Sequence, residues 1–362
     1  MKARVRNTAL ALAAVSTAVS PTACGADAGS TSGEGSARKI SVLLPDSTTA
    51  RWETRDRPLL ERRIGQLCGD CAIEHANAEG DVAIQQKQMD SSIADGVDAI
   101  VLTAVDARAM AASVGRAAAA HIPVIAYDRL AEGPISGYVS FDGQEIGRLQ
   151  GRALLTAMGT KARGGRIVMM NGDPGDPNAL SFKQGALSEL RGRTTIAKEY
   201  DTPEWSTETA NRNMSGALSA LGAGSIDGVY AANDGLAAGC IAALKADKVT
   251  PLPPVTGQDA ELAAVRRIVA GDQYMTVYKP FGPEAAAGGA MAVAAARGRS
   301  LDAVATRRVK TRGGAEVPAV LLTPVPVVLA TIKNTLVKDG VYTLEQICPL
   351  SLAGDCHKAG LT

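Results

Sequence analysis

Aromatic side chains are scarce in this chain. Its 362 residues include 2 Trp, 7 Tyr and 3 Phe, so Val, Leu, Ile and Ala must supply most of any hydrophobic core. A charge excess of either sign is also missing, because 38 Lys and Arg stand against 37 Asp and Glu. Binding to a phosphate backbone depends on a basic excess, so no nucleic-acid partner is expected.

Histidine motifs for metal binding and glycine-rich motifs for phosphate binding are missing too. The three histidines, His75, His121 and His357, do not stand at metal-ligand spacing, so no metal site is predicted. The first predicted strand is followed by Pro45-Asp-Ser-Thr-Thr49 and not by Gly-x-Gly-x-x-Gly. That loop lacks the glycines that bring backbone N–H groups to a dinucleotide pyrophosphate. No cofactor is therefore expected.

Long apolar runs are absent beyond the N-terminus. Three basic residues precede the apolar stretch Ala9–Val19, which is too short to span a bilayer and predicts a signal peptide over residues 1–23. Small residues before Cys24 resemble a lipoprotein cleavage site, although Pro21 replaces the usual aliphatic residue, so a conventional signal peptide cleaved nearby stays open. Residues 24–38 are rich in Gly, Ser and Ala, typical of a flexible tether. A lipid on Cys24 would anchor the protein to the outer face of the cell membrane.

The remaining cysteines agree with export to an oxidising compartment. Cys68 with Cys71, and Cys348 with Cys356, are each spaced to close a short loop as a disulfide. The alternative for the first pair is a redox or zinc motif, but no second matched pair accompanies it. Cys240 lies in an Ala-rich segment and is expected to be a buried free thiol.

Short apolar runs alternate with longer helical patterns from residue 39 onward. Continuous apolar strands are typical of a parallel sheet covered on both faces, and the alternation predicts an α/β fold of doubly wound parallel sheets. A Gly-rich break near residue 164 divides the alternation into two lobes. Strands are predicted at 40–44, 71–75, 99–102, 123–127, 165–170, 194–200, 228–231, 254–257, 275–278 and 317–322. Helices are predicted at 51–67, 81–95, 107–120, 179–191, 208–221, 234–246, 260–270 and 285–296.

Polar residues follow nearly every predicted strand. In open α/β sheets ligands bind outside the carboxyl ends of the strands, so these positions are candidates for a site. Helix N-capping is a sufficient explanation for Asp106 and Asp234. Capping does not explain Arg129 and Lys279, because neither side chain accepts hydrogen bonds from a helix N-terminus.

The two tryptophans, Trp52 and Trp205, also follow strands, one in each lobe. An indole on either side of a cleft ringed by Asp, Asn, Arg and Lys suits a sugar. The C–H faces of a pyranose stack on aromatic rings, and charged groups satisfy its hydroxyls. The alternative is that both indoles are ordinary half-buried surface residues.

The chain resembles the periplasmic sugar-binding proteins of bacterial ABC importers, in particular the D-xylose-binding and multiple-sugar-binding members. The resemblance rests on eight runs that follow one another in order across residues 39–342. They are Arg51-Trp52 with Asp56-Arg57, Ala126-Tyr-Asp-Arg129, Val139-Ser-Phe-Asp142, Gly172-Asp-Pro-Gly-Asp-Pro-Asn-Ala179, Ala232-Asn-Asp-Gly235, Thr256-Gly-Gln-Asp-Ala-Glu261, Gly271-Asp-Gln-Tyr-Met-Thr-Val-Tyr-Lys-Pro280 and Pro318-Ala-Val-Leu-Leu-Thr-Pro324.

The resemblance implies a set of sugar contacts. The first lobe would contribute hydrogen bonds from Arg51, Asp128 and Arg129, and the indoles of Trp52 and Trp205 would stack on opposite faces of the sugar. The second lobe would complete the polar ring with Asp176, Asn178, Asn233, Asp259 and Lys279.

The resemblance also implies how the lobes are built and what they do. Two discontinuous lobes, residues 39–145 plus 281–320 and residues 146–280 plus 321–362, would be joined by a three-segment hinge, the type I periplasmic binding protein architecture. A monomer would capture a monosaccharide, D-xylose or a related aldose, by hinge closure and deliver it to an ABC permease. A multiple-sugar-binding protein for glucose, galactose and arabinose, or one serving a membrane sensor, remains open.

Two other classes fit the residues less well. A glycoside hydrolase could use Asp128, Asp176 and Asp259, but Arg51, Arg129 and Lys279 are expected to keep these carboxylates ionised, which leaves no general acid. A transcriptional repressor would need an N-terminal helix-turn-helix where the signal peptide and tether are predicted. We therefore expect a binding protein and not an enzyme.

Overall fold

The computed structural model describes residues 37–361, which belong to one compact unit. The predicted signal peptide, Cys24 and nearly all of the tether lie outside the described residues. Within the described part, no helix is both long and apolar enough to cross a bilayer.

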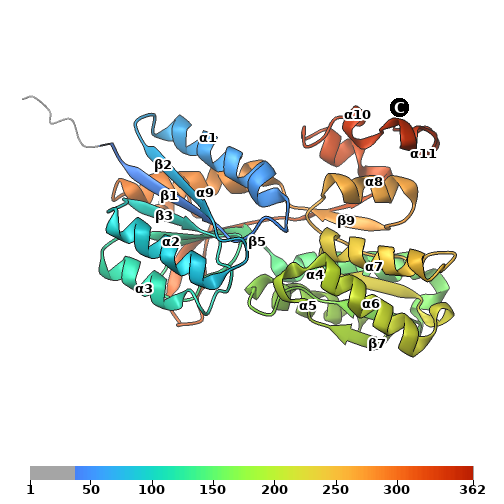
Figure 1. Ribbon diagram of the computed structural model, residues 1–362. Coiled ribbons are helices and arrows are strands. Elements are labelled where there is room, and N and C mark those ends of the chain that lie inside the picture. Colours follow the sequence, from blue (N-terminus) through green and yellow to red (C-terminus); the bar gives the residue numbers. More distant parts are fainter. Residues whose placement is uncertain (1–36, 362) are drawn as a thin grey trace, which may run out of the picture. The chain divides into compact units, whose positions relative to one another are not determined.

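The first lobe is built on a seven-stranded sheet in the order β10-β11-β5-β4-β3-β1-β2 (Figure 1). All neighbouring strands are parallel except β10 and β11, which pair antiparallel at one edge. The strands are β1 (Lys39–Leu44), β2 (Ala72–Asn77), β3 (Ala99–Leu102), β4 (Val124–Tyr127), β5 (Gly137–Phe141), β10 (Arg307–Lys310) and β11 (Glu316–Leu322).

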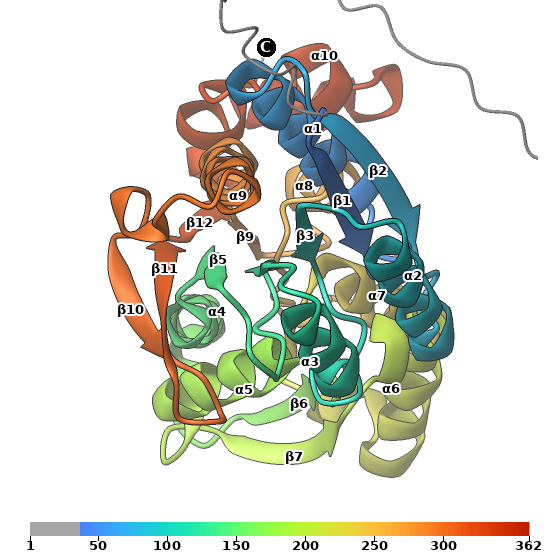
Figure 2. The same cartoon turned by 90° about the vertical axis from the view of Figure 1, so that its left-hand side faces the viewer.

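Helices cover both faces of this sheet (Figure 2). On one face, α1 (Arg57–Leu67) and α9 (Phe281–Ala296) enclose a core with β1, β3 and β4. On the other, α2 (Val82–Ala94) and α3 (Ala111–Ala119) enclose a second core. The central strands β3 and β4 are fully buried along their whole length, as a doubly covered parallel sheet requires.

The second lobe has a parallel three-stranded sheet in the order β7-β6-β8 and an antiparallel pair, β9 with β12. Its strands are β6 (Arg166–Met170), β7 (Thr195–Tyr200), β8 (Gly228–Ala231), β9 (Met275–Tyr278) and β12 (Val325–Val328). Its helices are α4 (Gly143–Met158), α5 (Pro177–Leu190), α6 (Thr207–Leu221), α7 (Asp234–Ala246), α8 (Leu262–Ala270), α10 (Leu344–Ile347) and α11 (Ala353–Lys358).

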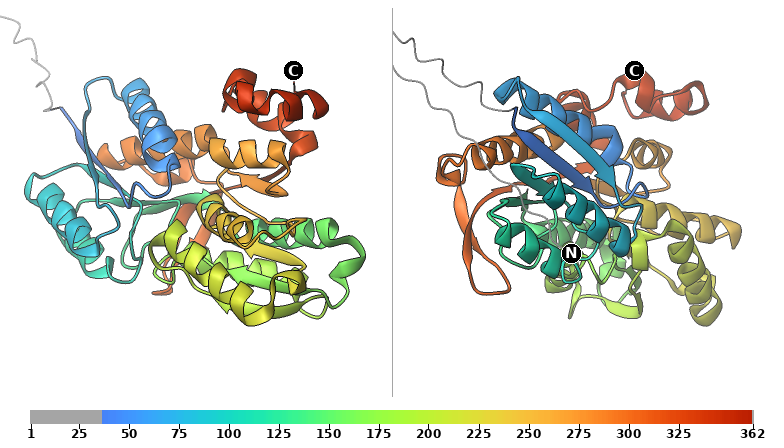
Figure 3. Two further views of the ribbon diagram at one scale, coloured as in Figure 1. Left: turned by 45° about the vertical axis from the view of Figure 1, so that its right-hand side comes forward. Right: turned by 60° about the vertical axis from the view of Figure 1, so that its left-hand side comes forward.

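The chain passes between the lobes three times, which the views of Figure 3 allow the reader to follow. The passages lie between β5 and α4, between β9 and α9, and between β11 and β12. The exact residue at which each lobe begins and ends stays a prediction.

Several predicted elements differ from the observed ones. Residues 254–257 do not form a strand, and only Val255 makes a bridge, to Val229, since Pro253 and Pro254 have no N–H to donate. The helix predicted at 51–67 opens with a π-helical turn, Trp52–Asp56. The helix predicted at 107–120 begins only at Ala111. The pattern missed β5, α4, β10, β12 and the C-terminal helices.

Both cysteine pairs are disulfide-bonded in the structure. Cys68–Cys71 joins the end of α1 to the start of β2, and Cys348–Cys356 closes the loop between α10 and α11. A thiolate is needed to bind a metal, so bonding between the sulfurs of Cys68 and Cys71 removes both as ligands beside Asp70. Cys240 is a buried free thiol, as expected.

Candidate functional site

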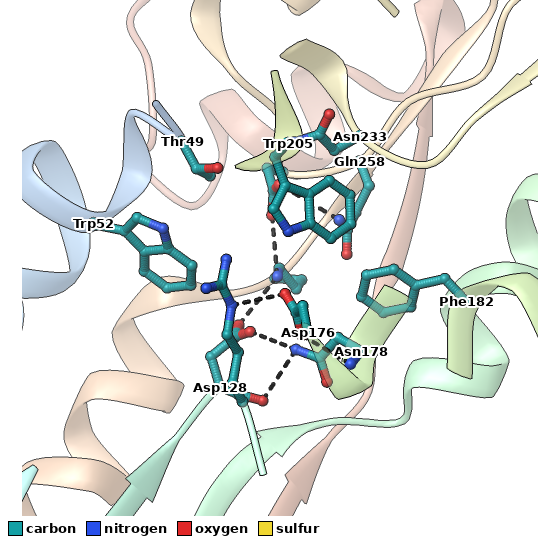
Figure 4. A pocket seen from close by; sticks show the side chains of 12 residues that line it. Thr49, Trp52, Asp128, Asp176, Asn178, Phe182, Trp205, Asn233 and Gln258 are labelled. Carbon is teal, nitrogen blue, oxygen red and sulfur yellow. Dashed lines mark hydrogen bonds and ion pairs between the residues drawn. The ribbon is translucent and has the colours of Figure 1, made fainter. Parts of the chain in front are cut away.

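A small cavity lies between the lobes, and we call it the cleft pocket (Figure 4). The residues that line it are at most 9% exposed, so a ligand can enter only if the lining side chains separate. The lining residues are Thr49, Trp52, Asp128, Arg129, Asp176, Asn178, Phe182, Trp205, Asn233, Gln258, Asp259 and Lys279.

Asp128 lies at the carboxyl end of β4, and the surrounding structure fixes its backbone. Its φ of 58° is in the left-handed region, which a non-glycine residue adopts only when its neighbours hold it there. The Asp128 carbonyl accepts hydrogen bonds from Ser140 Oγ at 2.6 Å and from Tyr138 Oη at 3.2 Å. These bonds direct the carboxylate into the cleft pocket.

Lys279 connects two carboxylates of the pocket. Its Nζ lies 3.1 Å from Asp128 Oδ2 and 3.0 Å from Asp259 Oδ1, and all three side chains are at least 95% buried. Burial disfavours the charged form of Asp128, but Lys279 and Arg51 outweigh it and lower the pKa of Asp128 to about 2. The same carboxylates raise the pKa of Lys279 against the effect of burial. Asp128 and Lys279 are thus both charged at neutral pH.

A second ion pair joins the two lobes. Arg129 Nε lies 2.7 Å from Asp176 Oδ2, and both side chains are at least 96% buried. Burial outweighs the guanidinium and raises the pKa of Asp176 to about 6, so the carboxylate is still mostly ionised at neutral pH, but less firmly than the sequence led us to expect. Asp176 also caps α5 by accepting a hydrogen bond from the Asn178 backbone N–H at 2.8 Å.

Trp52 enters the pocket from the π-helical turn Trp52–Asp56, a helix type that is frequent at functional sites. The guanidinium of Arg51 lies 4.5 Å from the Trp52 ring centroid and that of Arg129 5.6 Å from it. Two cations at these distances favour a fixed ring through cation–π attraction.

Trp205 reaches the pocket from the other lobe, as Figure 4 shows. It ends the 3-10 turn Pro203–Trp205, and its φ of 51° is again left-handed. The ring of Phe182, on α5, lies 6.4 Å away at a tilt of 58° and extends the aromatic wall.

Amide side chains contribute the neutral part of the lining. Asn178 Nδ2 donates to Asp128 Oδ1 at 2.7 Å, a direct bond between the lobes. Asn233 is the N-cap of α7 and accepts from the Leu236 backbone N–H through Oδ1, which leaves its Nδ2 available to a ligand. The capping role predicted for Asp234 is therefore wrong. Asp234 is buried and accepts bonds from Gln273 Nε2 and Thr276 Oγ1 instead.

Arg51 is the one predicted contact residue that does not line the cavity. Its guanidinium is 98% buried and bonds to Asp56, Glu284 and Asp128 at 2.5–2.9 Å. Burial disfavours its charge, but these three carboxylates raise the pKa of Arg51 well above its ordinary value. Arg51 thus fixes the Asp128 carboxylate through a direct ion pair, without itself lining the cavity.

Several buried polar atoms of the pocket have no hydrogen-bond partner. Among the described residues they are the Nε1 atoms of Trp52 and Trp205 and Gln258 Oε1. A buried polar atom without a partner costs free energy unless something else pairs with it. The pocket therefore offers both donors and acceptors to a ligand that carries several hydroxyl groups.

Thr49 and Phe182 line the pocket although the sequence did not indicate them, and Gln258 lines it directly after the predicted strand 254–257. Phe182 lies four residues after Asn178 on α5, so the two share a helix face, and this spacing could have revealed it. Gln258 and Thr49 stand beside the predicted Asp259 and Arg51.

The sequence and the fold were both compared with known proteins. The model of the periplasmic binding protein domain matches residues 40–300. The D-xylose-binding periplasmic protein of Escherichia coli is 33% identical over 85% of this chain and 92% of its own length. The multiple sugar-binding periplasmic protein of Azospirillum brasilense is 31% identical over 85% of this chain and 90% of its own.

A solved structure agrees with these relatives. An ABC transporter solute-binding protein from Clostridium phytofermentans with bound β-D-glucose superposes with a TM-score of 0.79 at 27% identity, covering 86% of this chain and 100% of its own. Together the matches confirm the predicted family, a family of binding proteins and not of enzymes, and its α/β fold. The chain belongs to the periplasmic binding protein family.

Proposed function

We propose that this protein captures a monosaccharide, D-xylose or a related aldose, and delivers it to an ABC importer. The observation that carries the proposal is the composition of the cleft pocket. Two indoles, one from each lobe, flank ion-paired carboxylates and amides, and their Nε1 atoms have no partner. Aromatic faces suit the C–H surface of a pyranose, and charged groups form strong hydrogen bonds to its hydroxyls.

The charges of the pocket favour a neutral ligand. Three carboxylates (Asp128, Asp176 and Asp259) and two cations (Arg129 and Lys279) line it, and each cation already faces a carboxylate. A sugar acid would bring another negative charge next to buried carboxylates, which is costly. We therefore expect neutral aldoses to bind and the corresponding uronic acids to be rejected.

Capture would proceed by closure of the lobes. The residues that line the cleft pocket are buried, so the lobes must separate before a sugar can enter. A ligand that contacts both lobes then stabilises the closed form through its higher affinity for that form. The relatives' names support both a xylose-specific protein and a receptor for several sugars.

The proposed location is the outer face of the cell membrane, with a lipid on Cys24 as the anchor. A membrane sensor remains the alternative partner to an importer, because either partner would bind the closed form of the protein. The Gly/Ser/Ala-rich residues 24–38 support a flexible tether between such an anchor and the lobes.

Calorimetric titration of residues 37–362 with D-xylose, D-glucose, D-galactose, L-arabinose and D-ribose tests the proposal. Micromolar or tighter binding of xylose alone would favour the xylose-specific form, and similar binding of several aldoses the multiple-sugar form. Absence of binding to all five by a folded sample would contradict the proposal.

A matched pair of variants then ties binding to the cleft pocket. Asp259→Ala should weaken sugar binding by about 2–4 kcal/mol, since it removes charge-assisted hydrogen bonds and leaves Lys279 with one partner fewer. Asp302→Ala, an exposed residue of the first lobe, is the control and should leave the affinity unchanged. Equal affinity of both variants would remove Asp259 from the site.

A further inference from the structure

Gly172 lies against the indole of Trp205 without lining the cleft pocket itself. It follows β6 by two residues and is buried. A Cβ atom at this position would stand 2.1 Å from Cη2 and 2.4 Å from both Cζ2 and Cζ3 of Trp205. Because carbon atoms in contact are about 3.5–4.0 Å apart, no side chain fits there while the indole keeps its place.

The backbone around Gly172 also holds the turn that carries Trp205. The Gly172 carbonyl accepts a hydrogen bond from the Thr202 N–H at 3.2 Å, and the Thr202 carbonyl accepts one from the Trp205 N–H at 3.2 Å. Next to Gly172, a carboxylate oxygen of Asp173 accepts a hydrogen bond from the Glu204 N–H. The segment after β6 therefore fixes the turn as well as the ring.

This support matters because Trp205 is held in an unfavourable backbone conformation. Glu204 and Trp205 have φ values of 58° and 51°, which cost non-glycine residues free energy. Consecutive left-handed residues persist only where surrounding contacts fix them. One contact is the hydrogen bond that the Glu204 N–H donates to the Asp173 carboxylate, and the other is the packing of the Trp205 ring against Gly172.

We propose that Gly172 is a positioning residue for ligand binding, which sets the location of the Trp205 ring in the cleft pocket. The absence of a side chain at Gly172 creates the space that the outer part of the indole fills. The inference rests on the proposed sugar-binding function, and it assigns to Gly172 a role in affinity that acts through Trp205 alone.

The test is a double-mutant cycle between Gly172→Ala and Trp205→Ala, read by sugar titration. In the otherwise unchanged protein, Gly172→Ala should weaken binding at least tenfold, because the added methyl group displaces the ring by about 1 Å or more. In the Trp205→Ala background there is no ring to displace, so Gly172→Ala should change the affinity less than twofold. Gly216→Ala on α6, where no atom lies within 4 Å of the added Cβ, is the matched control.

Two outcomes would overturn the proposal. One is an equal loss of affinity in both backgrounds, which would mean that Gly172→Ala damages the lobe as a whole. The other is a Gly172→Ala variant that binds sugar as tightly as the control.

A readout without sugar separates this proposal from the proposed function. The chain has only two tryptophans, so Trp52→Phe leaves Trp205 as the single indole fluorophore. Adding Gly172→Ala to that variant should shift the Trp205 emission maximum, and an unchanged emission would contradict the positioning role. If the unmodified protein binds no tested sugar, the proposed function fails, while the emission still decides whether Gly172 positions the ring.

Discussion

Strained backbone occurs at three residues that line the cleft pocket. Asp128, Trp205 and Asp259 all have positive φ values, of 58°, 51° and 92°. Such conformations persist where neighbouring contacts hold them, and they cluster at functional sites. Each residue projects its side chain into the pocket, so the strain is found where ligand contacts are proposed.

Asp176 is the pocket residue that should make binding sensitive to pH. Burial raises its pKa to about 6, against the opposing effects of Arg129 and Lys279, with Asp128 adding to the rise. Above pH 6 the carboxylate is charged and accepts strong hydrogen bonds. As the pH falls through 6 it takes up a proton, so sugar affinity should weaken between pH 7 and pH 5. Asp128, with a pKa of about 2, stays charged throughout this range.

Titrations at pH 5, 6, 7 and 8 measure this dependence. The matched variant is Asp176→Asn, which keeps the shape of the side chain but does not titrate, and its affinity should be nearly constant over the range. An unmodified protein whose affinity is the same at pH 5 and pH 8 would show that Asp176 does not contact the ligand.

At the scale of elements, α4 and α5 approach so closely that glycine is required between them. A Cβ at Gly147 on α4 would stand 1.9 Å from the carbonyl oxygen of Phe182, and one at Gly185 on α5 would stand 2.0 Å from that of Gln144. This close contact places the first turn of α5, with Asn178, and the ring of Phe182 at the cleft pocket.

Gly147→Ala should therefore force the two helices apart. Overpacking of this kind costs roughly 1–3 kcal/mol of the free energy of unfolding, measurable as a lower urea midpoint. Gly216→Ala, on the open side of α6, is the control and should not lower stability, because alanine favours a helix over glycine. A Gly147→Ala variant as stable as the control would mean that the helices shift without cost.

At the scale of the whole molecule, the C-terminal segment contacts both lobes. Arg55, in the π-helical turn of the first lobe, donates to the Val341 carbonyl at 2.6 Å, and its guanidinium lies 4.9 Å from the Tyr342 ring centroid. Tyr342 in turn donates from its hydroxyl to the carbonyl of Ala260, next to Asp259. Leu59 of α1 packs against the same C-terminal core.

These contacts should stabilise the closed arrangement of the lobes. Arg55→Ala removes the bond to Val341 and the stacking on Tyr342, so the open form gains population and sugar affinity should weaken by about tenfold. Arg57→Ala is the control, because within residues 37–361 Arg57 pairs only with Glu53 and Glu61 of its own lobe. Titration of both variants decides the matter, and indistinguishable affinities would contradict a role for the C-terminal segment in closure.

The sequence by itself determined the α/β alternation, because continuous apolar runs mark buried parallel strands. The strand-end rule and the resemblance to sugar-binding proteins together predicted nine of the residues that line the cleft pocket, and Asp176 and Asn178 came from the resemblance alone. Residues next to a strand end, such as Asp128 and Lys279, were therefore readable from local pattern alone.

Only the tertiary structure decided which of these groups face one another. Three features depend on segments that are distant in sequence. They are the ion pair of Arg51 with Asp128, the raised pKa of Asp176 and the contact of Gly172 with the Trp205 ring. Which polar groups meet across the cleft is a property of the packed chain, and such pairing leaves no periodic signal along the sequence. Residue type and spacing thus predicted which residues take part in the site. Packing determined their pKa values, their partners and the distances between them.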